Sequence, residues 1–162
     1  MAPSMRVQTA QLDTAKTLVS VARFVVAFDG TGTEISFSEL AGITSEVAVA
    51  DYTASGKGGV TLAKQFGLTK PATVTLKRGI DQDNALWEWH QEVLRGLPSA
   101  KRGCTLFLQD ITGQNKQQYH LLNAWPSKLD IGGMKAGGGD AAIATVTLVC
   151  EQIDLEGTKY AP

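Results

Sequence analysis

The chain has 162 residues, 43% of them hydrophobic, which is typical of one globular domain and too apolar for a disordered chain. Fifteen Lys and Arg against sixteen Asp and Glu give a net charge of -1, which argues against a strongly basic nucleic-acid-binding domain. No apolar run approaches the roughly 18 residues of a membrane-spanning helix. Residues 1–6 lack the pattern of a secretory signal peptide, so we expect synthesis and folding in the cytosol.

Charged residues make up 19% of the chain, below the roughly 25% of an average soluble domain. Burial of surface in an oligomer would explain this deficit. The two cysteines, Cys104 and Cys150, both lie in apolar stretches. In a cytosolic chain this favours two small buried hydrophobic residues over a disulfide.

Residues 1–20 read as an N-terminal extension, and residues 21–162 as the domain. The β-branched and aromatic run at residues 21–28 predicts a strand, which the turn residues at 29–32 close. Residues 34–40 alternate apolar and polar side chains and should pair back as a hairpin.

A further strand is predicted over residues 46–52, followed by a flexible, Gly-rich loop over residues 53–59 and a less regular connection as far as Pro71. Residues 72–78 again alternate as a two-sided strand. Helical spacing over about residues 82–95 predicts one amphipathic helix, with Asp81 as its N-cap and Asp83 in its first turn. Trp87 and Trp89 are expected to anchor this helix, with at least one indole buried.

Residues 105–109 and 117–122 form the next predicted hairpin, and Pro126 should end or bend its second strand. After a Gly-rich connection, residues 143–155 read as one long strand covered on both faces. Seven or eight strands around one helix make the chain mainly β, with a β-barrel or closed sandwich as the simplest architecture.

The motifs that could carry chemistry are weak. Gly56-Lys57-Gly58-Gly59 lacks the Ser or Thr and the earlier Gly that a phosphate loop needs, and the glycines at 137–139 precede a strand where a dinucleotide site needs a helix. His90 and His120 have no partners at metal-ligand spacing, and no nucleophile motif is present. We therefore expect no enzyme activity, cofactor or metal.

Two short basic pairs, Lys77-Arg78 and Lys101-Arg102, are more typical of solvated charges than of a nucleic-acid site. A role in salt bridges between subunits is less typical of such pairs than solvated charges, but more typical than a nucleic-acid site.

Five blocks, in order, resemble the signature of tail tube proteins from contractile phage tails, and most closely the inner-tube subunits of phage-tail-like contractile injection systems. The resemblance covers about residues 22–157. The blocks are Phe24-Val25-Val26-Ala27-Phe28-Asp29-Gly30, Phe37-Ser38-Glu39-Leu40-Ala41-Gly42, Val74-Thr75-Leu76-Lys77-Arg78-Gly79, Leu86-Trp87-Glu88-Trp89 and Asn123-Ala124-Trp125-Pro126-Ser127-Lys128.

The resemblance implies a β-barrel of two packed antiparallel sheets with one flanking α-helix. It also implies hexameric rings that stack into a hollow tube, which a contracting sheath drives through a target envelope. The expected partners are further copies of the chain, sheath subunits, baseplate and tube-cap proteins, and protein cargo in the lumen, without membrane insertion of the free subunit.

The segment around residues 53–70 is the one that the resemblance places against neighbouring subunits. Here the chain has Thr53-Ala54-Ser55-Gly56 where the family usually has a charged Arg-Glu-Gly, and Phe66 in place of a proline, so ring contacts should differ in detail. The interface residues predicted from it are Tyr52, Ser55, Lys57, Lys64, Phe66 and Lys70.

Two alternatives remain open from the sequence. A tube-initiating baseplate protein of the same fold would form a ring without polymerising. A monomeric β-barrel that binds a small ligand in its interior belongs to a different functional class.

Overall fold

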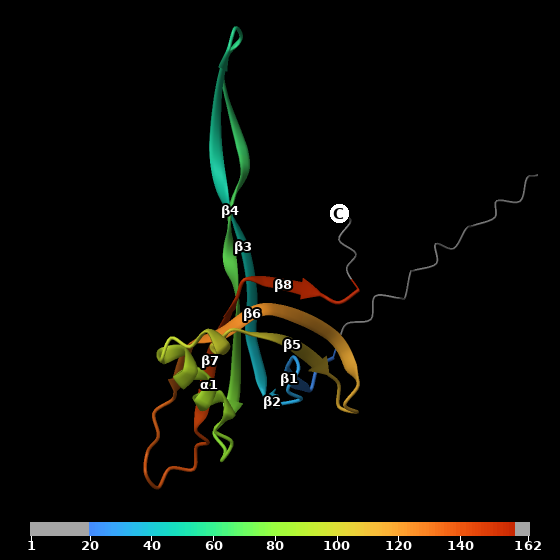
Figure 1. Ribbon diagram of the computed structural model, residues 1–162, viewed down its shortest axis with the longest axis vertical. Coiled ribbons are helices and arrows are strands. Elements are labelled where there is room, and N and C mark those ends of the chain that lie inside the picture. Colours follow the sequence, from blue (N-terminus) through green and yellow to red (C-terminus); the bar gives the residue numbers. More distant parts are fainter. Residues whose placement is uncertain (1–19, 158–162) are drawn as a thin grey trace, which may run out of the picture.

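A computed structural model describes residues 20–157 as a mainly β protein with eight strands and one α-helix (Figure 1). Of the extension expected at residues 1–20, only residue 20 falls within this range. The strands are β1 (Arg23–Phe28), β2 (Glu34–Phe37), β3 (Glu39–Gly56), β4 (Gly59–Gly79), β5 (Arg102–Gln109), β6 (Asn115–Ile131), β7 (Ile143–Cys150) and β8 (Gln152–Leu155). The helix is α1 (Ala85–Leu94), followed by the single 3-10 turn η1 (Pro98–Ala100).

All strand pairs are antiparallel, in the order β2-β1-β5-β6-β7-β4-β3, with β8 also paired to β6. Strand β6 joins the two halves of the sheet, because its first part pairs with β5 and β8 and its last part pairs with β7. The predicted mainly β class with one helix is confirmed. Among the described residues, no ladder joins the two end strands, β2 and β3, to close the barrel.

The core lies between the two halves of the sheet and under α1. Alternate positions of the strands point into it, as the pattern of buried and half-buried residues along β7 shows. The largest fully buried side chains include Trp89, Ile35, Leu76, Leu106, Leu121 and Leu148.

Both predicted hairpins of the body are confirmed: β1 pairs with β2, and β5 with β6. The single long strand expected over residues 143–155 is wrong. The chain leaves β7 at Glu151, whose N–H donates to the carbonyl of Leu122 at 3.0 Å, and then continues as β8 against the other half of the sheet. The face of β7 away from the core is only half-buried, so the strand is not fully covered on both sides.

Pro126 does not end its strand. It is buried within β6 opposite Leu148, and the ladder shifts register between Pro126 and Lys128. This irregularity accommodates a residue that has no N–H to donate, and the strand bends where it passes from one half of the sheet to the other.

The helix begins later than its sequence pattern predicts. Asn84 occupies the N-cap position, so Asp81 is not the N-cap. Asp81 instead accepts the N–H of Asp83 at 2.9 Å, and Asp83 accepts the N–H of Ala85 at 3.1 Å. The helix ends before Gly96, whose φ of 70° is readily adopted by glycine.

The two tryptophans of α1 have different environments. Trp89 is 2% exposed, and its indole N–H donates to the carbonyl of Ala100 at 2.7 Å. Its ring meets Phe28 edge-on at 4.8 Å, and the guanidinium of Arg102 lies 5.8 Å from the ring centre. Trp87 is 48% exposed and lies beside a surface pocket. The helix is thus attached to the sheet through Trp89.

The largest departure from expectation is the region predicted as a loop and an irregular connection. Residues 53–59 and the segment up to Pro71 are not a loop: they belong to the long hairpin of β3 and β4, which turns between Gly56 and Gly59. Residues 46–70 of this hairpin project from the body, and we call them the arm (Figure 1). The arm is paired by backbone hydrogen bonds over its length, with two register shifts near its base.

The turn between β5 and β6 is held by Asp110, which accepts hydrogen bonds from the N–H and the hydroxyl of Thr112 and from the N–H of Gln114. These bonds, the hydroxyl of Thr112 foremost, lower the pKa of Asp110 to about 2. The carboxylate therefore stabilises the fold above its unfolded pKa of about 3.9 and loses this contribution as the pH falls towards 2.

We expect the melting temperature of the parental protein to fall more steeply between about pH 4 and pH 2 than that of Asp110→Asn. Thermal unfolding followed by circular dichroism across this range tests the prediction. Equal slopes would show that the turn contributes nothing to acid sensitivity.

Candidate functional site: a subunit interface

The arm has two different faces. Residues directly opposite each other in an antiparallel ladder point to the same side, so the register assigns each side chain to a face. One side, which we call the apolar face, carries the pairs Val49–Phe66, Asp51–Lys64, Thr53–Leu62 and Ser55–Val60. The other side, the small face, carries Ala50–Gln65, Tyr52–Ala63 and Ala54–Thr61.

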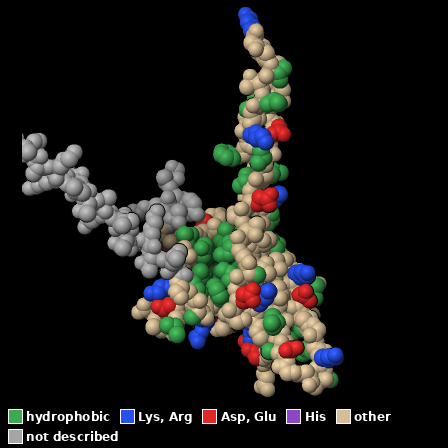
Figure 2. Space-filling model, turned by 180° about the vertical axis from the view of Figure 1, so that it is seen from behind, with side chains coloured by type: hydrophobic (Ala, Val, Ile, Leu, Met, Phe, Trp, Pro, Cys, Tyr) green, Lys and Arg blue, Asp and Glu red, His purple; other side chains and the backbone are tan. Residues whose placement is uncertain are grey.

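The apolar face is open to solvent. Phe66 is 97% exposed and Leu62 77%, and Val49 and Val60 are also exposed. Figure 2 shows hydrophobic side chains along the arm, with Lys and Asp or Glu between them. Isolated exposed hydrophobic residues are ordinary, but several apolar side chains on one face of a projecting hairpin are typical of an interaction surface.

All six predicted interface residues lie on the arm. Ser55, Lys64 and Phe66 are on the apolar face, Tyr52 is on the small face, and Lys57 is in the turn at the tip. Lys70 lies near the base, where its ammonium contacts the carboxylate of Glu46 at 2.6 Å.

Sequence reasoning missed Val49, Val60 and Leu62. A signal for the last two was present, since Val60, Leu62, Phe66 and Leu68 recur at even positions with Lys64 between them.

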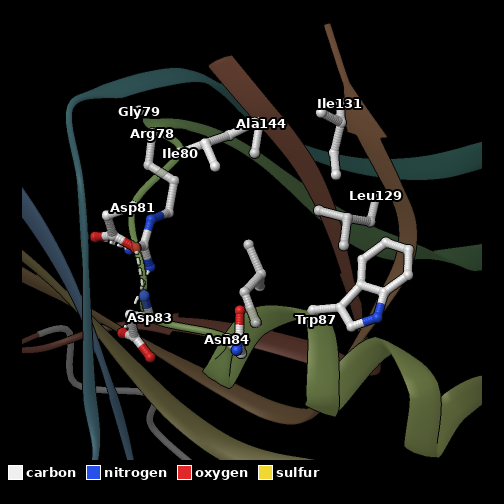
Figure 3. A pocket seen from close by; sticks show the side chains of 11 residues that line it. Arg78, Gly79, Ile80, Asp81, Asp83, Asn84, Trp87, Leu129, Ile131 and Ala144 are labelled. Carbon is white, nitrogen blue, oxygen red and sulfur yellow. Dashed lines mark hydrogen bonds and ion pairs between the residues drawn. The ribbon is translucent and has the colours of Figure 1, made fainter. Parts of the chain in front are cut away.

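A pocket of about 320 Å³ lies near the far end of β4, between that strand, α1, β6 and β7. We call it the base pocket (Figure 3). Ile80, Trp87, Leu129 and Ile131 supply apolar walls, and Arg78, Asp81 and Asp83 lie together on another side.

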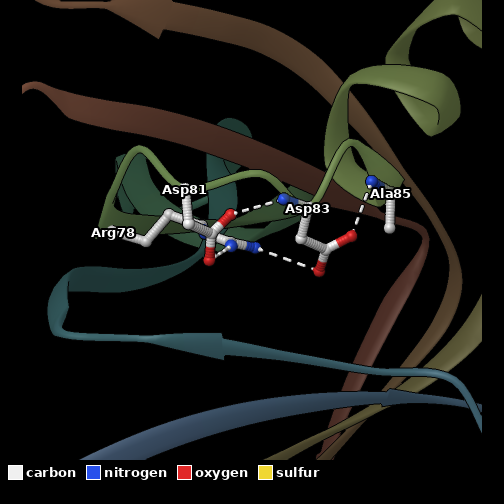
Figure 4. A network of polar contacts seen from close by, with 4 residues as sticks. All are labelled: Arg78, Asp81, Asp83 and Ala85. Carbon is white, nitrogen blue, oxygen red and sulfur yellow. Dashed lines mark hydrogen bonds and ion pairs between the residues drawn. The ribbon is translucent and has the colours of Figure 1, made fainter.

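The polar side of the base pocket is an ionic network (Figure 4). Nη2 of Arg78 donates to the carboxylate of Asp81, and Nη1 lies 3.8 Å from a carboxylate oxygen of Asp83. The N–H of Asp83 contributes most to lowering the pKa of Asp81, and Arg78 adds to the effect. Arg78 itself is buried, so the expectation of a solvated charge is wrong for this residue.

The other basic residues are partly paired within the body. Lys77 contacts Glu39 at 3.3 Å, Lys101 contacts Glu151 at 3.3 Å, and Arg102 makes two hydrogen bonds to Glu92 at 2.8 and 2.9 Å. The partly buried Arg102 does not fit the expectation of a solvated charge either. These contacts explain the basic pairs without a nucleic acid.

The two cysteines and the two histidines pack or hydrogen-bond within the fold. Cys104 and Cys150 are free and buried, as predicted, and burial raises their pKa to about 12 and about 11. A ring nitrogen of His90 lies 3.1 Å from the carbonyl of Pro126, and one of His120 lies 3.1 Å from the hydroxyl of Thr105. Within residues 20–157, no group of three or more His, Cys, Asp and Glu is placed to hold a metal ion.

No helix in the described part of the chain is long and apolar enough to cross a membrane.

Solved structures of similar fold come from contractile assemblies. A chain in the anti-feeding prophage cap (AFP tube terminating cap) aligns with a TM-score of 0.72 at 20% identity, over 93% of this chain and 98% of that chain. A chain in the PVC sheath-tube complex in the extended state, an extracellular contractile injection system, aligns with a TM-score of 0.68 at 20% identity, over 89% of this chain and 95% of that chain. A chain in the AFP baseplate aligns with a TM-score of 0.68 at 18% identity, over 90% of this chain and 99% of that chain.

No curated protein matched the chain in a sequence comparison. A family match covers most of the chain, however: residues 20–154 match the T4-like virus tail tube protein gp19 family. Members of this family are structural tail tube proteins and not enzymes. The chain therefore belongs to the T4-like virus tail tube protein family.

Proposed function

We propose that this chain is the inner-tube subunit of a contractile injection system or contractile phage tail, and that it forms hexameric rings stacked into a hollow tube. The arm is the observation that carries the proposal. It extends an exposed apolar face away from the body, and a neighbouring subunit would cover that face in a stack of rings.

The free edges of the sheet support assembly within a ring. Strands β2 and β3 end the strand order, and among residues 20–157 their outer edges have no ladder partner. Unpaired edges readily associate with other chains, and a closed ring satisfies them without open-ended aggregation. The low charge content of 19% agrees with extensive burial between subunits.

In this role the subunit carries no covalent chemistry. We propose synthesis and assembly in the cytosol, into a tail-like particle whose sheath, baseplate and cap proteins are the other partners. The lumen would carry the cargo, and sheath contraction would drive the tube through a target envelope.

A second candidate role is that of a specialised ring at one end of the tube. The likeness to chains from a tube-terminating cap and from a baseplate structure favours it, because both assemblies contain this fold. Such a ring would assemble without continuing into a tube.

We expect the purified chain to form rings and stacked tubes at micromolar concentration. Mass photometry measures ring mass, and negative-stain electron microscopy distinguishes tubes from single rings. Single hexameric rings at every concentration would favour the terminal role, and monomers alone, with no rings in the native particle, would overturn both roles.

A further inference from the structure

We propose that the base pocket receives Phe66 from the arm of a second copy of this chain, with Lys64 of that arm beside Asp81 and Asp83. This inference rests on the proposed function, because it names the surface on which the arm docks. The two surfaces lie on one strand: β4 begins at the arm tip with Gly59, carries Lys64 and Phe66 within the arm, and ends at the base pocket with Gly79 (Figure 1).

The position of the two surfaces determines the kind of assembly. Phe66 and the pocket-lining Gly79 are 13 residues apart on β4, which is roughly 43 Å at about 3.3 Å each. A surface that binds a different surface on the next copy makes a head-to-tail contact, which repeats along an axis. The same contact made by every subunit of a ring would join that ring to the next.

Within residues 20–157, nothing covers the apolar part of the pocket. Ile131 is 44% exposed, and Ile80 and Trp87 are similarly open, although all three border a hollow of about 320 Å³. An inserted aromatic ring would remove these side chains from water together with its own surface, which is the main source of binding energy at such contacts.

The polar part of the pocket has a negative edge. The side chains of Asp81 and Asp83 stay more than half exposed, so two carboxylates surround one guanidinium. The local charge is therefore negative, and a lysine would complement it.

The arm presents the matching pair of groups. Phe66 and Lys64 are two residues apart on the apolar face, about 7 Å along the strand. Lys64 lies opposite Asp51, but no ion pair joins its ammonium to a described residue. An aromatic group with a neighbouring cation thus meets a pocket with an apolar part and a neighbouring acidic part.

Cross-linking between two cysteine variants tests the contact. Phe66→Cys and Ile131→Cys are prepared separately, mixed before assembly and oxidised, so that a bond between the new cysteines joins two copies. A disulfide needs Cβ atoms about 3.5–4.5 Å apart, so it reports close approach. The parental chain supplies the background, because Cys104 and Cys150 are buried.

Two control cysteine variants are matched to the tested ones in exposure or in position on the same element. Leu122→Cys lies on the same strand as Ile131 and is 43% exposed, but it is not in the pocket. Tyr52→Cys lies on the small face of the arm. We expect a cross-linked dimer from tubes that contain Phe66→Cys and Ile131→Cys, and its loss when either control replaces its counterpart.

Tubes that assemble normally without this dimer would overturn the inference and leave the proposed function intact. Failure of the parental chain to form rings would instead overturn the proposed function. If the cysteine variants do not assemble, charge reversal provides the test. Lys64→Glu alone should lose tubes. Mixing it with Asp83→Lys should restore them, because the arm of the Lys64→Glu chain then meets the pocket of the Asp83→Lys chain. No recovery would count against the pocket.

Discussion

Trp89→Ala should destabilise the folded subunit by about 3–5 kcal/mol, the usual loss when a buried tryptophan is truncated. Trp89 is 2% exposed and packs edge-on against Phe28 at 4.8 Å. Its removal leaves a cavity under α1 and deprives the buried carbonyl of Ala100 of its hydrogen bond. Trp87→Ala on the same helix should have a much smaller effect, because its side chain is half exposed.

Urea unfolding, followed by circular dichroism on unassembled protein, gives the free energy of unfolding for each variant. Trp89→Phe is the matched control: it keeps most of the apolar contact but removes the indole N–H, so its loss should fall between those of the other two variants. Equal stability of Trp89→Ala and the parental protein would show that the helix is not attached through this residue.

The body of the fold could be predicted from the sequence because its signals are local. Residues 72–78 alternate between core and outer side chains, and that period of two survives in the structure. The helix was predictable from its apolar spacing and from Gly96 at its end. Its start was not, because Asp81 has the chemistry of an N-cap but is engaged by Arg78 and the N–H of Asp83.

The arm was the hardest part to predict. Strands are usually recognised because one face is buried, but the residues of the arm are largely exposed on both faces within a single chain. The small and glycine residues at 53–59 then read as a flexible loop. The arm is nonetheless paired throughout, and the apolar alternation from Val60 to Leu68 is the signal that identifies it as a strand.

The base pocket could not be predicted at all. Its walls come from the end of β4, the start of α1, β6 and β7, so residues more than 40 positions apart in the chain, such as Arg78 and Ile131, come together only in the folded sheet. The burial of Arg78 follows instead from the alternation of residues 72–78, since it continues the buried positions of Ala72, Val74 and Leu76.

Replacing the apolar face of the arm with polar side chains should abolish long tubes and leave the subunit folded. The triple variant Val60→Ser, Leu62→Ser and Phe66→Ser removes three exposed apolar side chains that make no part of the core. Full burial of each would stabilise a contact by about 1.5–3 kcal/mol, so the triple change should weaken association by at least about a thousandfold. Stability of the free subunit should change little.

A control on the other face separates apolar contact from general disturbance of the hairpin. Thr61→Ser, Ala63→Ser and Gln65→Asn change three neighbouring positions of the same strand, but on the small face, and should leave tubes intact. A shortened arm gives an independent test: replacing residues 50–65 with Asn-Gly closes a two-residue hairpin and keeps Val49 opposite Phe66.

These three proteins distinguish the role of the arm in folding from its role in assembly. Circular dichroism should show a folded β protein for all of them, with a weaker strand signal only for the shortened one, because the core residues and the β4–β7 ladder are unchanged. Electron microscopy of the same samples should show tubes only for the control variant, since small losses at one contact are repeated in every ring of a stack. Normal tubes from the triple variant would remove the apolar face from the interface, whereas an unfolded shortened protein would show that the arm belongs to the folding unit.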